Sequence, residues 1–479
     1  MSYAARIVRG VLPLLPIVAL GLPRVVGAQG EPAAAHPSRQ LSLDEAVRLA
    51  HATSEAIAIA RAGVDGAGGE RRRASGTRLP RVAAFSSFDR TIRSEFDGLA
   101  LGEPDAGDEP ALPFGSPTTY RAGLSLTQPV FTGGRTLARG RAATSGQRAA
   151  ELALTSARAQ AALDVAEAYF DAALSEQLVG IVDATLAQAE STLHQAALLF
   201  EAGRGSEFDY LRAKVARDRQ RPVVTRQRGE RDVAMLRLKQ LVHVPADTDL
   251  DLTTGLDLEP AAVVARAASM EAPTGGDGSA PGVAGRSVAD YAAVREGAAR
   301  LHQREQLLTA ARAQRWPGVA LTSSWERVAY SRGGIPAHQD FRTNWTVGAR
   351  VDLPLLAGGQ RAGDEVEADA ALTAARAELR RIEQLAEFDG RAAAAQLATA
   401  EAAWAASEGA VHEAARAHEI AVVRHREGLA IQLELADARL ALEAARAERA
   451  RAARDLLVAR LRATLLPDLP SAGRSGGSR

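Results

Sequence analysis

The stretch QPVFTGGRTLARGRAATSGQ, residues 128–147, joins a short segment of alternating apolar and polar residues to a long tract rich in alanine and arginine. The stretch DLPLLAGGQRAGDEVEADA, residues 352–370, makes the same transition later in the chain. In each stretch, a proline is followed by a pair of glycines. Because alternation predicts a strand and an Ala/Arg/Glu tract predicts a helix, the chain encodes one strand–helix junction twice.

The spacing of glycines repeats between the two halves. Gly203 lies 70 residues after Gly133, and Gly428 lies 70 residues after Gly358 (203 − 133 and 428 − 358). Loops tolerate insertions, so equal spacing predicts two helices that must end at the same height. At 1.5 Å per residue, each helix would be about 100 Å long. The residues predicted to form the two strand–helix junctions are Gly133, Gly134, Gly358 and Gly359.

Composition limits the classes of protein that this chain of 479 residues can form. Its 58 basic residues balance 58 acidic ones, which argues against a protein that coats nucleic acid through a basic surface. The chain has no cysteine, so disulfides, thiol catalysis and cysteine-ligated metal sites are excluded. Aromatic residues make up only 4%, and alanine, arginine, leucine and glutamate dominate, which is typical of long packed helices.

The order of these patterns divides the chain into two similar halves. A basic start, a short apolar run and small residues predict an export signal peptide over residues 1–28. The residue pattern of each half predicts a helix, two strands and a long helical hairpin, over residues 41–242 in the first half and 287–466 in the second. Ser42, with Glu45 three residues later, predicts the start of the first helix. The remaining segments are expected to be a flexible leader at 29–40, a linker and equatorial segment at 243–286, and a disordered tail at 467–479.

The four predicted strands each have one apolar and one polar face. Such a sheet either buries its apolar face under its own helices or turns it to lipid in a barrel with a polar interior. Four strands cannot close a barrel, for which about eight is the minimum, so the barrel requires several chains. Three chains would supply twelve strands, and no helix is expected to cross a membrane. The aromatic residues predicted to lie at the membrane interface are Tyr120, Trp325, Tyr330 and Trp345.

Five stretches carry a resemblance to a known family: LSLDEAVRLA (41–50), YRAGLSLTQPVFTGGR (120–135), ALDVAEAYFDAALSEQ (162–177), VGARVDLPLLAGGQR (347–361) and VVRHREGLAIQLELADARLALEAARAE (422–448). In their order and duplication they resemble the TolC-like outer membrane efflux proteins. The resemblance implies an α+β membrane protein: a homotrimer whose twelve strands form one β-barrel in outer-membrane lipid. Long antiparallel α-helices would form a coiled-coil barrel in the periplasm. Segment 243–290 would contribute to a belt around this cylinder.

The resemblance further implies an exit duct for efflux or secretion, coupled through a periplasmic adaptor (membrane fusion) protein to an inner-membrane transporter. Family members close the periplasmic end with acidic side chains. Glu434 and Asp437, at i and i+3 of one helix, would form two stacked carboxylate rings that select cations. Asp209 and Arg212 occupy the equivalent places in the first half. The helix tips expected to contact the adaptor are Gly203, Arg204, Gly205, Gly428, Leu429 and Ala430.

Two other functional classes are weighed against the duct. A periplasmic coiled-coil scaffold or adaptor without a pore would bury the apolar strand faces within the protein. An enzyme is not expected, because the chain has neither the Gly-Lys-Ser/Thr of a phosphate loop nor a Gly-x-Ser-x-Gly elbow. No catalytic residue, metal site or cofactor is therefore predicted. The cargo, the pump, the adaptor and the trigger of the gate are not determined by the sequence.

Overall fold

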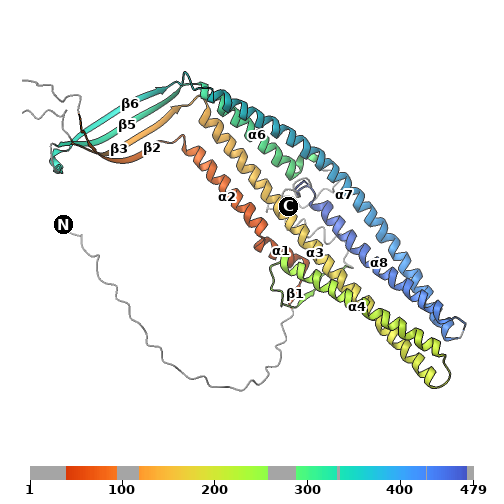
Figure 1. The fold of residues 1–479 in the computed structure, drawn as a ribbon. Helices are drawn as coiled ribbons and strands as arrows, with labels where there is room; N and C mark the ends of the chain where they lie inside the picture. The colour runs from red at the N-terminus through yellow and green to blue at the C-terminus, as the bar shows by residue number, and fades with distance from the viewer. Residues whose placement is uncertain (1–38, 94–117, 257–286, 332–334, 428, 472–479) are drawn as a thin grey trace, which may run out of the picture.

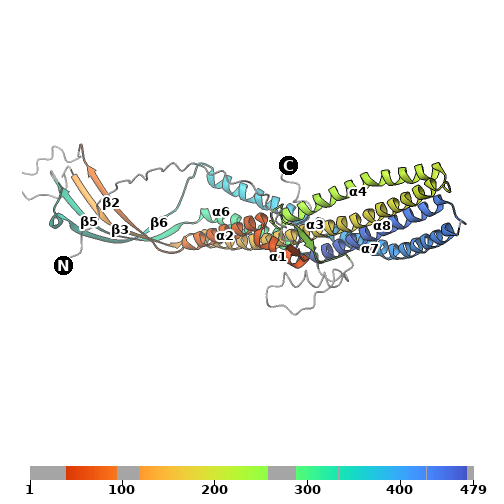
Figure 2. The same cartoon turned by 90° about the horizontal axis from the view of Figure 1, so that it is seen from below.

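The computed structural model describes residues 39–93, 118–256, 287–331, 335–427 and 429–471. The described chain is elongated, with a β-sheet at one end and the tips of two helical hairpins at the other (Figure 1). The same separation is visible from below (Figure 2). The molecule therefore divides into a strand end, a helical shaft and a pair of tips.

Several predicted features lie outside the described residues. These are the signal peptide at 1–28, residues 29–38 of the leader, residues 257–286 of the equatorial segment, and the tip residue Gly428. Within the described ranges, none of the helices combines the length and the apolar character needed to cross a bilayer.

The helices follow the two halves of the chain. The first half contains α1 (Leu43–Thr53), α2 (Glu55–Gly76), α3 (Arg135–Glu201) and α4 (Glu207–Leu241). The second half contains α6 (Ala292–Arg312), α7 (Gln360–Arg426) and α8 (Gln432–Leu465), with single 3₁₀ turns at Val288–Asp290, Ala313–Arg315 and His338–Asp340. The predicted cap is confirmed, because the Ser42 hydroxyl accepts a hydrogen bond from the Glu45 amide at 3.3 Å.

The two long outgoing helices have equal lengths, as the glycine spacing predicts. Helices α3 and α7 each contain 67 residues, about 100 Å of helix. Gly134 and Gly359 precede them with φ of 87° and 85°, in the left-handed region that glycine adopts without a steric cost. Gly133 also has a positive φ, 62°, and a Cβ there would lie 2.5 Å from Trp316 Cβ. The glycines are therefore required by the geometry of the two junctions.

The buried positions of the long helices follow a seven-residue period. On α7, the buried residues that keep this period are Leu372, Ala386, Ala393, Ala400, Ser407 and Ala421. On α3, the corresponding series is Ala142, Ala149, Ser156, Leu163 and Phe170. A sustained heptad makes paired helices wind around each other with a left hand. Helix α3 packs on α2, α4, α6 and α8, whereas α7 packs mainly on α6 and α8 and is otherwise exposed.

The strands of both halves form one antiparallel sheet in the order β2-β3-β5-β6. Its members are β2 (Arg81–Arg90), β3 (Thr118–Phe131), β5 (Gly318–Ser331) and β6 (Arg342–Asp352). The pairing of β3 with β5 joins the two halves of the chain side by side. The four predicted strands are confirmed, and β2 and β6 form the two edges of the sheet in the single chain.

The register of the sheet separates an apolar from a polar face. Leu124 pairs with Trp325, which pairs with Trp345, so all three lie on one face. On the other face the Asn344 amide donates to Glu326 Oε1 at 3.0 Å. The helices do not cover the apolar face, since Trp345 is 71% exposed and Val347 is 75% exposed. This is the opposite of what a pore-free scaffold with buried strand faces requires.

A hydrophobic core at the waist of the molecule joins both ends of the described chain to the helical shaft. Strand β1 (Arg39–Leu41) pairs in parallel with β4 (Leu250–Leu252). The Tyr169 hydroxyl, on α3, donates to Leu41 O at 2.9 Å and accepts from the Thr254 amide at 2.9 Å. Tyr169 is fully buried, so this side chain holds the two strands against α3.

Two predicted boundaries are corrected at this waist. Arg39 and Gln40, assigned to the flexible leader, belong to β1 because their backbones pair with β4. The start of the predicted disordered tail, up to Ser471, is ordered, since Leu469 is buried in the core and Pro467 O accepts from the Ala292 amide at 2.7 Å. Apolar burial therefore extends the C-terminal structure past the predicted end at 466.

Candidate functional site

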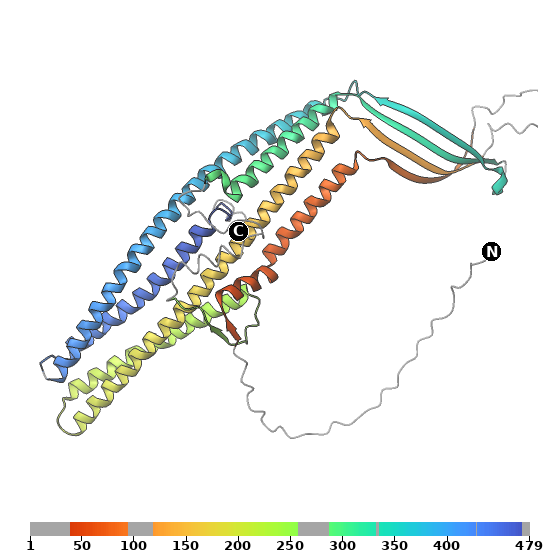
Figure 3. The ribbon, with the colours of Figure 1, turned by 180° about the vertical axis from the view of Figure 1, so that it is seen from behind.

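The two helix tips lie at the same end of the molecule, far from the sheet (Figure 3). At the first tip, α3 ends in a turn in which Gly203 has φ of 66°. The amides of Arg204 and Gly205 both donate to Leu199 O, at 2.9 and 2.8 Å. A Cβ on Gly205 would come within 3.0 Å of Leu199, so the tight turn explains both glycines.

The second tip reverses the chain between α7 and α8, on either side of position 428. The Leu429 amide donates to Arg424 O at 2.8 Å, and His425 Nδ1 lies 3.2 Å from Ala430 O. Ile431 caps α8 without a side-chain bond to the helix. At the start of α4 on the first tip, the Ser206 hydroxyl accepts from the Phe208 amide at 3.1 Å.

The predicted gate residues occupy the turns next to these tips. Glu434 is 43% exposed at its side chain and forms an ion pair with Arg424 of α7 at 3.1 Å. Asp437 lies one turn further along α8 and is exposed, as is Asp209 at the start of α4. Arg212, one turn beyond Asp209, is partly exposed. Each predicted pair therefore sits on a single helix, at the positions that the sequence assigns.

Arg424 is a residue of the tip that sequence reasoning missed. It pairs with Glu434 because α7 and α8 are antiparallel and both residues lie close to the turn between them. Residues equally far from a hairpin turn meet across it, and this symmetry was the available signal. The pair partly neutralises the carboxylate that was expected to belong to an acidic ring.

Large apolar side chains are exposed around both tips. Phe208 is 69% exposed and Leu429 is 72% exposed. Leu198, Leu199, Phe200, Leu211, Ile431 and Leu433 are also exposed. The Phe200 and Tyr210 rings stack at 5.7 Å across the first tip. Apolar side chains gathered at the exposed end of a helical hairpin are typical of a protein–protein contact.

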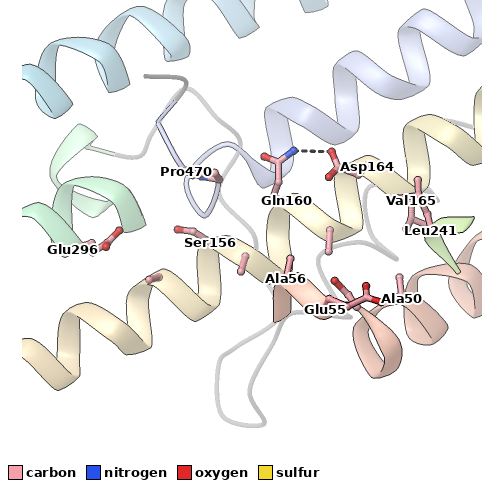
Figure 4. A pocket seen from close by; sticks show the side chains of 14 residues that line it. Ala50, Glu55, Ala56, Ser156, Gln160, Asp164, Val165, Leu241, Glu296 and Pro470 are labelled. Atoms are coloured by element: carbon pink, nitrogen blue, oxygen red, sulfur yellow. Dashed lines mark hydrogen bonds between the residues drawn. The ribbon is translucent and has the colours of Figure 1, made fainter. Parts of the chain in front are cut away.

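A cavity of about 450 Å³ lies at the waist, between the α1–α2 break, α3 and the C-terminal segment (Figure 4). Gln160 donates to Asp164 within its wall at 2.7 Å, and Glu55 lies at its edge. Glu55 bonds His243 Nε2 at 2.8 Å, and this hydrogen bond lowers the pKa of the carboxyl. Burial lowers the pKa of the neighbouring His51 and so favours its neutral form.

The described residues offer no obvious place for a metal ion. Among them, no group of three or more histidine, aspartate or glutamate side chains is arranged to ligate one. The junction, tips and waist are instead built from turns, ion pairs and packed helices.

The fold is that of outer-membrane channels of known structure. VceC from Vibrio cholerae aligns over 88% of this chain and 95% of its own, with 21% identity and a TM-score of 0.69. CmeC from Campylobacter jejuni aligns over 90% and 86%, with 15% identity and a TM-score of 0.71. The Neisseria gonorrhoeae MtrE channel, in its open state, aligns over 90% of both chains, with 20% identity and a TM-score of 0.69.

The family follows from the sequence model that the chain matches. Residues 46–242 and 287–466 match the outer membrane efflux protein family, and the chain belongs to that family. The two matched segments coincide with the two halves that the glycine spacing predicts. The resemblance to TolC-like proteins is thereby confirmed. A comparison with curated protein sequences gives no match.

Proposed function

We propose that three copies of this chain form an outer-membrane duct with one twelve-stranded β-barrel. The observation that carries the proposal is the exposed apolar face of the sheet, on which Leu124, Trp325 and Trp345 stand in one row. Lipid covers such a face when it forms the outside of a barrel, while the polar face lines the interior. The edge strands β2 and β6 then pair with neighbouring copies, which satisfies their free backbone groups.

The register also divides the predicted interface aromatics. Tyr120, Trp325 and Trp345 belong to the apolar face, where aromatic rings reach the boundary between lipid and water. Tyr330 pairs with Thr119, so it lies on the opposite face with the polar residues. In the proposed barrel, three of the four aromatics contact lipid and Tyr330 faces the interior.

The helical shafts of the three copies form the periplasmic part of the duct. The exposed flank of α7 then packs against the next copy, which extends the heptad packing around the cylinder. The exposed apolar tips, including Phe208 and Leu429, receive a periplasmic adaptor that couples the duct to an inner-membrane transporter. The duct performs no bond chemistry and serves as the exit for efflux or secretion.

The gate lies where the tips converge. Glu434 and Asp437 approach their copies around the threefold axis and form two acidic rings that attract cations. The Arg424–Glu434 ion pair ties α7 to α8 and resists separation of the hairpin. Asp209 and Arg212 occupy the positions on α4 that are equivalent to Glu434 and Asp437 on α8. Opening requires the tips to move apart, which the adaptor can drive by binding the exposed apolar residues.

Planar-bilayer conductance tests the duct and its gate together. The wild type is expected to conduct with a preference for cations, and Glu434→Ala/Asp437→Ala is expected to lose most of that preference. Glu448→Ala is a matched control, because Glu448 is an exposed carboxylate further along α8. An unchanged preference in the double variant would remove both residues from the gate. A mature chain that is monomeric and soluble without detergent would reject the duct itself.

A further inference from the structure

A large cavity lies at the first strand–helix junction, separate from the gate and the tips. Its volume is about 860 Å³, and it is bounded by the ends of β2, β3, β5 and β6 and by the first turns of α3. Arg81, Arg135 and Arg139 line it, opposed by a single lining carboxylate, Asp352. Phe131 and Trp316 add exposed aromatic surface to the same wall. The cavity is therefore basic and partly apolar.

The three arginines have no ion-pair partner among the residues that the structure describes. No carboxylate of the described chain lies within bonding distance of their guanidinium groups, and Arg135 Nε is buried without a hydrogen-bond acceptor. The described residues that form the second junction are different. Gln314 donates to Asp364 there at 3.1 Å, and Arg312 and Arg315 both pair with Glu365. The described part of the second junction also has an arginine without an ion pair, Arg361, which donates to Leu355 O at 3.2 Å, so the first junction differs in gathering three such arginines around one cavity.

The fold of the junction does not require these arginines. In the second half, Gln360 occupies the position equivalent to Arg135, and Asp364 occupies the position equivalent to Arg139. Helix α7 nevertheless begins with the same glycine geometry as α3. Arg135 and Arg139 lie four residues apart on one helix face, where like charges repel. A cation in the first turn also opposes the helix dipole. The arginines therefore reduce the stability of α3 unless an anion is bound.

We infer that this cavity binds a phosphate ester, held by the guanidinium groups of Arg81, Arg135 and Arg139. Planar guanidinium groups bind phosphate oxygens with paired hydrogen bonds, and an anion here would satisfy Arg135 Nε. The inference rests on the proposed function, which places the junction at the membrane surface. Phosphate at that level comes from a lipid headgroup or from a soluble phosphorylated compound. Phe131 and Trp316 offer apolar surface to the carbon chains of a lipid.

Native mass spectrometry of the detergent-solubilised oligomer tests the site with two probes, dioctanoyl phosphatidylglycerol and sn-glycerol 3-phosphate. The variant Arg135→Gln/Arg139→Gln replaces both guanidinium groups by shorter, neutral amides that remain polar. It is expected to bind the preferred probe at least about tenfold more weakly than the wild type. The control Arg141→Gln/Arg148→Gln removes two exposed arginines of the same helix outside the cavity, and it is expected to bind like the wild type. Arg81→Gln tests the same cavity from a strand and leaves α3 unchanged.

The two probes distinguish the sources of phosphate. Tighter binding of the lipid assigns a headgroup site, and equal or tighter binding of glycerol phosphate assigns a soluble compound. The inference is overturned if neither probe binds, or if the cavity variants and the control lose affinity equally. Conductance measured on the same samples separates the two proposals. A conducting channel that binds neither probe rejects the phosphate site and leaves the duct in place.

Discussion

Replacing Tyr169 by phenylalanine should loosen the waist while leaving the sheet and the tips unchanged. The hydroxyl donates to Leu41 O and accepts from the Thr254 amide, both at 2.9 Å. Leu41 O keeps a second donor, the Thr253 amide at 3.1 Å, whereas Thr254 loses its acceptor. At a net value of about 1 kcal/mol for each bond, the change costs about 2 kcal/mol of local stability.

Hydrogen–deuterium exchange is the appropriate measurement, because it reports the free energy of local opening. A loss of about 2 kcal/mol corresponds to roughly a 30-fold increase in the opening equilibrium. Peptides that cover β4 and Thr254 should exchange faster by about that factor. Tyr210→Phe is the control, since this tyrosine lies at the first tip, stacked on Phe200. Unchanged exchange at β4 in Tyr169→Phe would refute the assigned role of the hydroxyl.

The same tyrosine predicts a dependence on alkaline pH. Burial raises the pKa of Tyr169 above its ordinary value of 10.0. The unfolded chain therefore loses this proton at a lower pH than the folded chain. The contribution of Tyr169 to stability is complete below pH 10.0 and is lost as the pH rises through the higher folded value. Tyr169→Phe should remove this part of the alkaline transition.

Three further predictions concern the junction, the sheet and the waist. Gly133→Ala should lower the melting temperature of the oligomer more than Gly358→Ala, because only the first Cβ collides with neighbouring atoms, while both share about 1 kcal/mol or more of left-handed strain. Trp345→Lys, on the proposed lipid face near the membrane interface, should reduce heat-resistant oligomer in outer-membrane fractions at a cost of up to about 1 kcal/mol, and Asn344→Lys, on the polar face, should not. Burial lowers the pKa of His51, so the contribution of neutral His51 to folding stability is present above pH 6.5 and is lost as the pH falls. His51→Gln should therefore weaken the dependence of the melting temperature on acid between pH 7.5 and 5. Equal effects of Gly133→Ala and Gly358→Ala, or of Trp345→Lys and Asn344→Lys, would contradict the first two predictions. An acid dependence of melting that is unchanged in His51→Gln would contradict the third.

Local signals predicted most of the architecture from the sequence. The alternation in β3 and β6, the cap at Ser42 and the glycine pairs depend on neighbouring residues, and each is found in the structure. The equal lengths of α3 and α7 followed from counting residues between glycines. Counting also separates the faces of Tyr330 and Trp325, because the two residues are five positions apart and an odd offset reverses the face of a strand.

Contacts between distant segments were not predictable in the same way. Strands β1 and β4 have three residues each and lie about 200 residues apart, so no periodicity marks them. Tyr169 lies in residues 162–177, within a predicted helix, but its hydrogen bond to Leu41 O depends on how that helix packs against β1. The Arg424–Glu434 pair likewise depends on the hairpin. The cluster of Arg81, Arg135 and Arg139 forms only when β2 returns to the start of α3.

Helices α3 and α7 have the same length and the same seven-residue period of buried positions, and this restricts how the length of the protein can change. Removing a few codons from α3 alone would leave one tip short of the other and turn its buried stripe away from its neighbours. A longer or shorter member of this family must gain or lose whole heptads in both long helices and the same length in the returning helices α4 and α8 that pack on them. Variants of altered span should therefore be attempted with seven-residue deletions that are matched in both arms of both hairpins.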